Sequence, residues 1–400
     1  MDFSLTEKEL KLQERTKEFT RQYITPRAAE LEKRDEFPKE VVQKAYEAGL
    51  MNLHIPPEAG GPGWSLLAET LVSEATGYGC AGMATSIMCN NLAFAPLVIA
   101  ATTEQLKKYV QPLITGKEAK FGAFCLTERT AGSDAASVAT KAVRDGDEWV
   151  INGVKCFITN APVASLFTVF TTTQPELKHK GLSVFMVPKG KAVKIGHTEN
   201  KVGQRSSVQT EVIFEDVRVP KDCLVGKEGD GFKTAMKTLD KTRAGIAAIA
   251  TGVAQRAVDE AAKFASVRQQ FGRPIGDYQG ISFTLADMGC RAAAARQLTR
   301  YAAWLADQGK DNSKDSAFAK FFAADSAMQN AIDAIQIFGG YGYVNEYPVE
   351  KLMRDAKLLQ IYEGTNQVQR VVASGVILKE SKGLDTGFRL KYPGRDAPQI

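Results

Sequence analysis

The segment that decides the fold is rich in β-branched and aromatic residues and reads Trp149-Val150-Ile151-Asn152-Gly153-Val154-Lys155-Cys156-Phe157-Ile158-Thr159. Two runs of this composition around an Asn-Gly pair predict a β-hairpin. Similar runs occupy residues 166–171, 182–187 and 210–214, with turn-forming residues between them. Residues 121–230 are therefore predicted to form a small antiparallel, barrel-like β domain.

Helical patterns lie on both sides of this domain. Residues 1–120 are predicted to form an N-terminal helical domain, and Thr6 with Glu9 supplies a capping box for its first helix. Residues 231–380 hold long alanine-rich segments joined by short loops, which predicts an up-down bundle of four or five helices, in essence a C-terminal four-helix bundle. Residues 381–400 show no periodic pattern and are predicted to be a loosely packed tail. The predicted fold class is α+β.

The composition is that of an ordinary soluble globular protein. The chain has 400 residues, 44% of them apolar and 24% charged, so a sizeable core is expected. The net charge of +5 comes from 51 basic and 46 acidic residues that are spread along the chain. This charge is too small and too dispersed to indicate nucleic acid, but it is compatible with an anionic substrate.

Cysteine and histidine usage excludes the common metal motifs. The six cysteines form no Cys-x-x-Cys pair and the three histidines lie far apart, so no metal site is predicted and the thiols suit a reducing compartment. The first residues resemble neither a signal peptide nor a transit peptide. No apolar run is expected to approach the roughly 18 residues that span a bilayer. The sequence thus predicts a cytoplasmic protein without a membrane segment.

One carboxylate near the C-terminus is the candidate catalytic group. Glu363 lies between Tyr362 and Gly364, and a Thr/Asn/Gln cluster follows. A glutamate beside apolar residues, with a glycine that lets another molecule approach the backbone, suits a general base that removes a carbon-bound proton. The alternative from these residues alone is an ordinary surface glutamate at a helix end with a C-cap glycine.

Five segments of the chain, in order, resemble motifs of the flavin-dependent acyl-CoA dehydrogenases. The resemblance covers about residues 1–380, and it implies the helix–sheet–helix fold of that family. The segments are Leu126-Thr127-Glu128-Arg129-Thr130-Ala131-Gly132-Ser133-Asp134, Phe157-Ile158-Thr159-Asn160, Arg268-Gln269-Gln270-Phe271-Gly272, Gln336-Ile337-Phe338-Gly339-Gly340-Tyr341-Gly342 and Tyr362-Glu363-Gly364-Thr365 with the residues that follow it to Arg370.

The resemblance implies FAD as the cofactor and assigns residues to it. Backbone and hydroxyl groups near the flavin ring would provide donors, and Phe157 would provide an apolar wall. A neighbouring subunit of a homotetramer would contribute Arg268 and Gln270 at the pyrophosphate, and Phe271 near the adenine. The full implied set is Phe124, Leu126, Thr127, Gly132, Ser133, Phe157, Thr159, Arg268, Gln270, Phe271, Ile275, Tyr278, Gln336, Gly339, Gly340, Thr365 and Gln367.

The resemblance also implies an acyl-CoA substrate. Glu363 would remove the α-proton of the thioester while hydride leaves the β-carbon for the flavin, which gives a 2-enoyl-CoA. Electrons would then pass to an electron-transferring flavoprotein. The implied substrate-binding residues are Ser133, Met88, Leu92, Asp240, Arg243, Ile246, Tyr362 and Gly364. Because Thr242 occupies the position where some relatives carry the base, Glu363 is the only candidate for that role.

Several points stay open at the level of sequence. Arg129 and Thr130 replace the proline-containing pair that is usual after Thr-Glu, and Ala161-Pro162 resembles the glutaryl-CoA branch, whereas residues 236–370 look closer to the short- and medium-chain enzymes. No arginine lies among the residues expected at the floor of the acyl pocket, which argues against a dicarboxyl substrate; these are Met88, Cys89, Asn90, Asn91, Leu92, Phe94, Ile246 and Tyr362. Short, medium, branched, cyclic and aromatic-derived acyl groups remain possible. Alternative functions are an oxygen-using acyl-CoA oxidase and a non-catalytic helical scaffold with a vestigial site.

Overall fold

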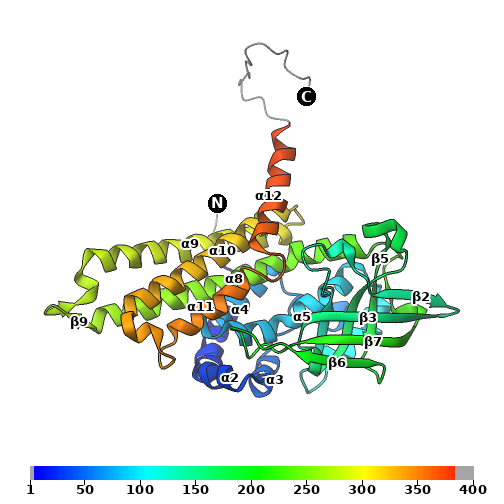
Figure 1. Cartoon of the computed structure of the whole chain (residues 1–400), viewed down its shortest axis with the longest axis horizontal. Coiled ribbons are helices and arrows are strands. Elements are labelled where there is room, and N and C mark those ends of the chain that lie inside the picture. The colour runs from blue at the N-terminus through cyan, green and yellow to red at the C-terminus, as the bar shows by residue number, and fades with distance from the viewer. Residues whose placement is uncertain (1–3, 383–400) are drawn as a thin grey trace, which may run out of the picture.

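The computed structural model of the protein describes residues 4–382. Its helices and sheet follow the predicted order along the chain, and in space the sheet lies at one end of the molecule (Figure 1). The predicted capping box is confirmed, since Thr6 Oγ1 accepts from the Glu9 backbone N–H at 3.3 Å and the Glu9 carboxylate accepts from the Thr6 N–H at 2.8 Å. The helices of the first part are α1 (Glu7–Phe19), α2 (Ala28–Arg34), α3 (Lys39–Glu47), α4 (Leu66–Gly79), α5 (Ala81–Ala100), α6 (Thr103–Gln105) and α7 (Gln111–Ile114).

Helix α5 lies in the core and contacts both the sheet and the C-terminal helices. Among the described helices it is the one that is long and apolar enough to cross a membrane by length and composition. The prediction that no apolar run approaches the length that spans a bilayer is therefore wrong. However, 78% of its most apolar window is buried inside the protein, as expected for the core helix of a globular domain.

The sheet is mixed and open, which corrects the prediction of an antiparallel barrel-like domain. Its strands follow the order β6-β7-β3-β2-β4-β5-β8, and β1 pairs with β4 outside this path. β1 pairs with β4 in parallel, and β2 also pairs with β4 in parallel over one residue pair. Parallel partners need a long connection, whereas a short hairpin can join only antiparallel strands. The strands are β1 (Phe121–Cys125), β2 (Lys141–Asp145), β3 (Glu148–Thr159), β4 (Ala164–Thr172), β5 (Leu182–Pro188), β6 (Val193–Thr198), β7 (Gln209–Pro220) and β8 (Leu224–Val225).

The predicted hairpin at Asn152-Gly153 is wrong, because β3 runs through this pair without a turn. The register against β7 shifts between Ile151 and Gly153, as in a β-bulge. The Asn152 side chain bonds Asp216 of β7, and a Cβ at Gly153 would lie 2.4 Å from Thr140 Oγ1. The Asn-Gly pair thus marks a bulge and a close approach of backbones. The actual hairpin joins β2 and β3 through Gly146, whose φ is 63°.

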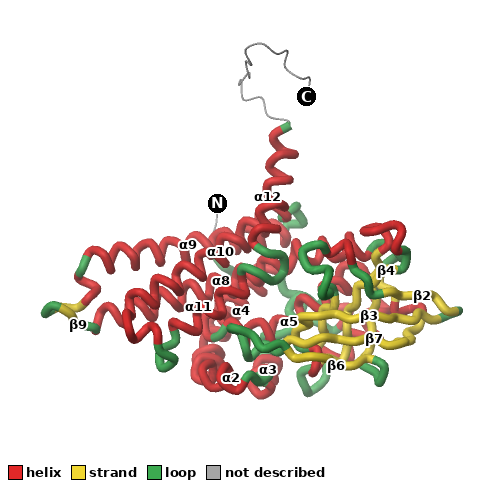
Figure 2. Tube along the Cα trace, in the orientation of Figure 1, coloured by secondary structure: helices red, strands yellow, loops and turns green. Residues whose placement is uncertain are grey.

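The C-terminal helices form the predicted bundle and extend away from the sheet (Figure 2). Small side chains line its core, including Ala250, Ala254 and Ala257, so the long helices pack closely. A two-stranded ribbon of β9 (Gln269–Gln270) and β10 (Arg273–Pro274) lies at its far end (Figure 1). The helices are α8 (Gly231–Val267), α9 (Gln279–Asp307), α10 (Ser313–Phe338), α11 (Val349–Leu359) and α12 (Asn366–Ser381). Of the predicted tail, residues 381–400, Ser381 still belongs to α12, and residues 383–400 lie outside the described residues.

Candidate active site

Glu363 lies in the irregular loop between α11 and α12. Its φ is 52° and that of Gly364 is 85°, so two consecutive residues adopt left-handed backbone. This conformation is costly for a glutamate and persists only where the surroundings enforce it. The side-chain amide of Gln369, which is fully buried, donates to the carbonyl oxygens of both residues at 3.1 Å. The turn that presents Glu363 is thus fixed by the helix that follows it.

The Glu363 carboxylate is partly buried and faces α8. Thr242 Oγ1 donates a hydrogen bond of 2.8 Å to its Oε2. Burial raises the pKa of Glu363, while the Thr242 hydrogen bond and the positive charges of Lys320 and Arg243 act to lower this pKa. The carboxylate is therefore a stronger base than an exposed one, and nearby donors and cations favour its ionised form.

Arg243 and Asp240 extend the site along α8. Arg243 is 3% exposed, and its Nη1 donates to Asp240 Oδ1 at 2.5 Å. The Arg243 Nε is buried and has no hydrogen-bond partner among the described residues, so it is a donor available to a polar ligand. A cleft with a volume of about 480 Å³ opens beside Asp240, and its walls include Lys237, Lys241, Lys310 and Trp64.

The predicted acyl-binding side chains come from three elements, and two of these, α8 and the loop before α12, also hold Thr242 and Glu363. Met88 and Leu92 come from α5, Ile246 from α8 and Tyr362 from the loop; Met88 and Ile246 are buried, the other two partly. Cys89, beside Met88, is buried, and its Sγ donates to the Thr159 carbonyl at 3.6 Å. Burial raises the pKa of Cys89 to about 12, and the negative charge of Glu363 contributes.

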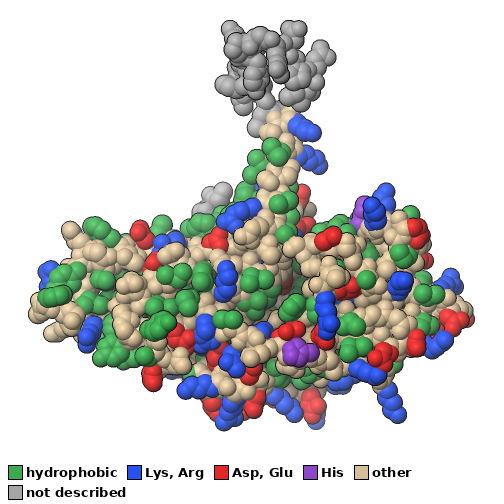
Figure 3. All heavy atoms as spheres, in the orientation of Figure 1, with side chains coloured by type: hydrophobic (Ala, Val, Ile, Leu, Met, Phe, Trp, Pro, Cys, Tyr) green, Lys and Arg blue, Asp and Glu red, His purple; other side chains and the backbone are tan. Residues whose placement is uncertain are grey.

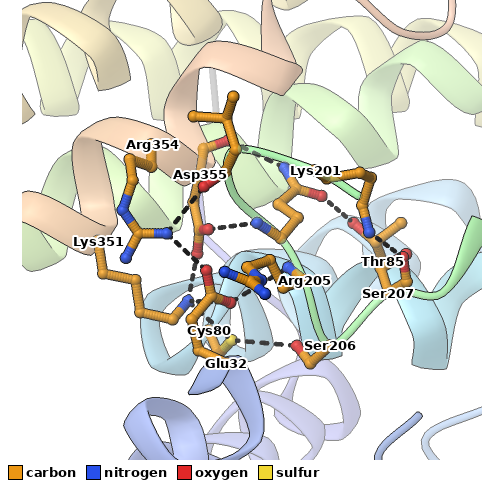
Figure 4. A network of polar contacts seen from close by, with 12 residues as sticks. Glu32, Cys80, Thr85, Lys201, Arg205, Ser206, Ser207, Lys351, Arg354 and Asp355 are labelled. Atoms are coloured by element: carbon orange, nitrogen blue, oxygen red, sulfur yellow. Dashed lines mark hydrogen bonds and ion pairs between the residues drawn. The ribbon is translucent and has the colours of Figure 1, made fainter. Parts of the chain in front are cut away.

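A buried polar network closes the site behind Tyr362. The Tyr362 and Thr85 hydroxyls lie 3.3 Å apart, and Thr85 donates to Gln204 Oε1 at 3.0 Å. Gln204 continues to Asp355, which pairs with Lys351 at 2.5 Å (Figure 4). Because these contacts link Tyr362 to α5, to the loop that holds Gln204 and to α11, the network restrains the Tyr362 ring.

The candidate flavin-ring residues lie where β1 and β3 end. The backbone N–H of Cys156 donates to the Thr127 carbonyl at 3.0 Å, which holds the two segments together. Below them, Lys155 Nζ donates to Glu128 at 2.7 Å and to the Leu126 carbonyl at 3.0 Å, and Glu128 also accepts from Thr140. Lys155 is fully buried, so this ion pair anchors the loop that begins at Leu126. Phe124, in β1, is partly buried against Phe170, with 5.0 Å between ring centroids.

These residues fit an aromatic, carbonyl-rich ring system such as a flavin. Phe157 has a φ of 58° and remains 56% exposed, so a strained backbone holds an apolar ring face at the surface. Thr159 Oγ1 accepts from Gln209 at 3.1 Å, and its own proton is given to no described residue. A Cβ added at Gly132 would meet no heavy atom within 4 Å, and Ser133 beside it is exposed. The donor set and the open backbone match what an isoalloxazine and a phosphate chain need.

The remaining predicted cofactor residues lie elsewhere in the chain. One group gathers around β9 at the end of the bundle opposite the sheet (Figure 1), where Arg268 lies 5.4 Å from the Tyr341 ring and Tyr278 donates to the Gln270 carbonyl at 2.9 Å. Phe271 is 95% exposed. A second group begins α12, where Thr365 is the N-cap and Gln367 is exposed. The end of α8, the β9–β10 ribbon and the end of α10 meet at this end of the bundle, as the contacts of Phe264 with Phe338 and of Arg268 with Tyr341 show. These segments hold Arg268, Gln270, Phe271, Ile275, Tyr278, Gln336, Gly339 and Gly340, whereas Glu363 belongs to the loop between α11 and α12.

Sequence reasoning missed several groups that shape the site. Lys320 of α10 is fully buried and donates to the Gly364 carbonyl at 2.8 Å. Gln369 and the Glu128–Lys155 pair were not selected for a positioning role either. A signal for Lys320 existed, because it shares one helix face with Ala317, Ala323 and Ala324 at helical spacing. A lysine within an otherwise apolar face is a candidate buried cation.

Comparison with known proteins gives matches along the whole described chain. Models of the acyl-CoA dehydrogenase N-terminal, middle and C-terminal domains match residues 6–117, 123–217 and 229–377. A short-chain-specific acyl-CoA dehydrogenase of Clostridium acetobutylicum is 42% identical over 381 residues, covering 95% of this chain and all of the relative. The butyryl-CoA dehydrogenase structure of Megasphaera elsdenii has a TM-score of 0.92 at 38% identity, covering 94% of this chain and all of that chain. A chain in a structure described as the electron transferring flavoprotein of Acidaminococcus fermentans has a TM-score of 0.92 at 42% identity, with 95% and 100% coverage.

Proposed function

The chain belongs to the acyl-CoA dehydrogenases, a family of flavin-dependent oxidoreductases, and we propose that it uses FAD to dehydrogenate short straight-chain acyl-CoA thioesters to 2-enoyl-CoA. The observation that carries the proposal is the placement of Glu363. A partly buried carboxylate in a fixed left-handed turn accepts a hydrogen bond from Thr242, on the helix that also carries Arg243 and Ile246. Such a group is suited to removing an α-proton from a bound thioester.

In this proposal, Glu363 Oε1 receives the α-proton, and Thr242 orients the carboxylate through its hydrogen bond to Oε2. The developing negative charge on the thioester oxygen needs donors placed in advance. The backbone N–H of Glu363 donates to no described residue, so it is available for this oxygen. Bound FAD would accept the β-hydrogen as hydride, and its ring would be held by Leu126, Thr127, Phe157 and Thr159.

The CoA portion would follow the charges along α8. Arg243, with its unpartnered buried Nε, offers a donor next to the thioester region. Lys237, Lys241 and Lys310 line the cleft beside Asp240 and suit an anionic nucleotide, while Trp64 offers a ring for stacking. A short acyl chain is favoured by the polar network behind Tyr362 and by the short-chain specificity in the name of the Clostridium relative.

A second copy of the chain would complete the cofactor site. Arg268, Gln270 and Phe271 lie at the far end of the bundle from Glu363, so a flavin held by the sheet of the same chain is out of their reach. Hydrophobic side chains cover much of the bundle surface and α12 (Figure 3), and they include Phe271, Phe283, Tyr343 and Val371. We place these surfaces in a homotetramer, with an electron-transferring flavoprotein as the electron acceptor.

The test is a substrate panel with a visible readout. The purified protein, loaded with FAD, is titrated without oxygen with short, medium, branched, cyclic and dicarboxyl acyl-CoAs. We expect loss of the oxidised flavin absorbance with butyryl-CoA at the lowest concentration. Failure of every thioester to reduce a bound flavin would refute the proposal, and rapid reoxidation by oxygen would identify an oxidase.

A further inference from the structure

Lys320 is a buried cation that the proposed reaction does not use directly. It is 0% exposed, and its Nζ donates to the Gly364 carbonyl at 2.8 Å and to Asn366 Oδ1 at 3.0 Å. Gly364 is the residue after the candidate base, so the hydrogen bond from Lys320 to its carbonyl stabilises the turn that presents Glu363. Asn366 is held in turn, since its side-chain amide donates to Asp325 at 2.7 Å.

Lys320 differs from the other buried lysines of the described chain in its lack of a contacting carboxylate. Lys155 and Lys351 lie 2.7 and 2.5 Å from Glu128 and Asp355. Within residues 4–382, no carboxylate oxygen lies within 4.0 Å of the Lys320 nitrogen. A buried ammonium without such a partner is costly unless other charges compensate. Glu363 is the largest source of compensation, and Asp325 adds to it.

We propose that Lys320 is a positioning residue for the base: its ammonium fixes the Gly364 carbonyl, and its charge keeps the Glu363 carboxylate ionised until substrate is bound. This inference rests on the proposed function for its kinetic consequence, but the electrostatic coupling belongs to the chain itself. The coupling has two sides. The pKa of Lys320 is lowered to about 7, because the effect of burial outweighs the opposing effect of the Glu363 carboxylate, which raises this pKa.

The remaining charged and titratable groups around the pair come from several elements. Arg243 of α8 opposes the charge on Lys320 and favours that on Glu363, while Asp325 of α10 favours the charge on Lys320. Cys89 of α5 and Tyr362 of the loop feel the Glu363 charge, but burial raises the pKa of both thiol and phenol, so they stay neutral. Lys320 and Glu363 are thus the two oppositely charged groups of this cluster whose titrations are coupled, and the reaction changes the charge of Glu363.

Gln369 provides a matched control, because it fastens the same turn without a charge. Its amide donates to the Glu363 and Gly364 carbonyls, and it is as deeply buried as Lys320. Lys320→Gln keeps an amide donor and removes the charge, whereas Gln369→Leu removes the neutral donor and leaves the charge. Lys320→Arg keeps the charge with a different shape.

The primary readout is the titration of the Glu363 carboxylate, followed by infrared difference spectroscopy, with Glu363→Gln to assign the band. We expect Lys320→Gln to raise the midpoint by about one pH unit. Gln369→Leu and Lys320→Arg should leave it near the wild-type value. The acid limb of acyl-CoA-driven flavin reduction should move with the midpoint. An unchanged midpoint in Lys320→Gln, or an equal rise in Gln369→Leu, would overturn the inference.

A reciprocal measurement covers the case in which Lys320→Gln does not fold. Two coupled sites shift each other's proton affinity equally. In protein with 15N-labelled lysine side chains, Lys320 should titrate near neutral pH and at lower pH in Glu363→Gln. The same Lys320 titration in both proteins would contradict the coupling. Neither titration requires turnover, so failure of the dehydrogenase proposal would be seen separately, as a flavin that no acyl-CoA reduces.

Discussion

Thr242 of α8 donates a 2.8 Å hydrogen bond to Oε2 of Glu363, a residue whose backbone is left-handed. Two elements far apart in sequence therefore meet at the candidate base. The Thr242 hydroxyl favours the ionised form of the Glu363 carboxylate, and it occupies one of the two carboxylate oxygens, Oε2. The other oxygen, Oε1, is free to face a substrate while the hydrogen bond from Thr242 to Oε2 is kept.

Replacing Thr242 with valine removes this donor while the side-chain shape is kept. A hydrogen bond to a charged group contributes about 1.5–3 kcal/mol, so the pKa of Glu363 should rise further. We expect the acid limb of flavin reduction to move to higher pH. Thr238→Val is the control, because the Thr238 hydroxyl donates to the Thr234 carbonyl one turn earlier in the same helix. Equal behaviour of the two variants would contradict the assigned role of Thr242.

Glu363→Gln should be inactive, and it should lack the decrease in stability that burial of the Glu363 carboxylate causes in wild type as pH rises. Because the folded-state pKa of Glu363 is raised above 4.5, the folded chain binds more protons than the unfolded chain between these two values. The wild type therefore loses stability as pH rises through this window, and the glutamine variant does not. Thermal unfolding from pH 4 to pH 8 should show a difference that grows with pH. A difference that is constant over this range would contradict burial of the carboxylate as its cause.

Gly364→Ala should disturb the turn that carries the base. Its φ is +85°, and an added Cβ would lie 2.5 Å from the Gln369 amide nitrogen that holds the turn. We expect flavin reduction to slow by roughly tenfold to a hundredfold, because small displacements of a reacting group are costly. Gly375→Ala, where the Cβ meets nothing within 4 Å, is the matched control and should reduce its flavin at the wild-type rate.

Lys155→Met should destabilise the protein and weaken FAD retention. It leaves the Glu128 carboxylate buried without its cation, a change that costs about 3–5 kcal/mol. The loop from Leu126 onward would lose its anchor. Lys194→Met breaks an exposed pair with Glu215 and should cost about 0–1 kcal/mol. Comparable urea midpoints and equal FAD content in the two variants would show that the buried pair does not anchor the loop.

The sequence predicted the order of the elements because strand and helix periodicities change at the domain limits. The prediction was wrong at Asn152-Gly153, because an Asn-Gly pair indicates an unusual backbone conformation but does not distinguish a hairpin turn from a β-bulge. It also failed on the sheet, where β1 pairs with the distant β4 in parallel, a choice that no local pattern encodes. The motif around Glu363 was visible, whereas Lys320 and Gln369 were not, because their roles depend on contacts between helices.

The most direct test of the central claim is the anaerobic reaction of the FAD-loaded protein with butyryl-CoA, compared between wild type and Glu363→Gln. We expect wild type to lose its oxidised flavin absorbance. The variant should bind the thioester but keep its flavin oxidised, slowed by at least about a thousandfold, since general bases contribute roughly 10²–10⁴-fold. Equal flavin reduction in both proteins would contradict Glu363 as the base.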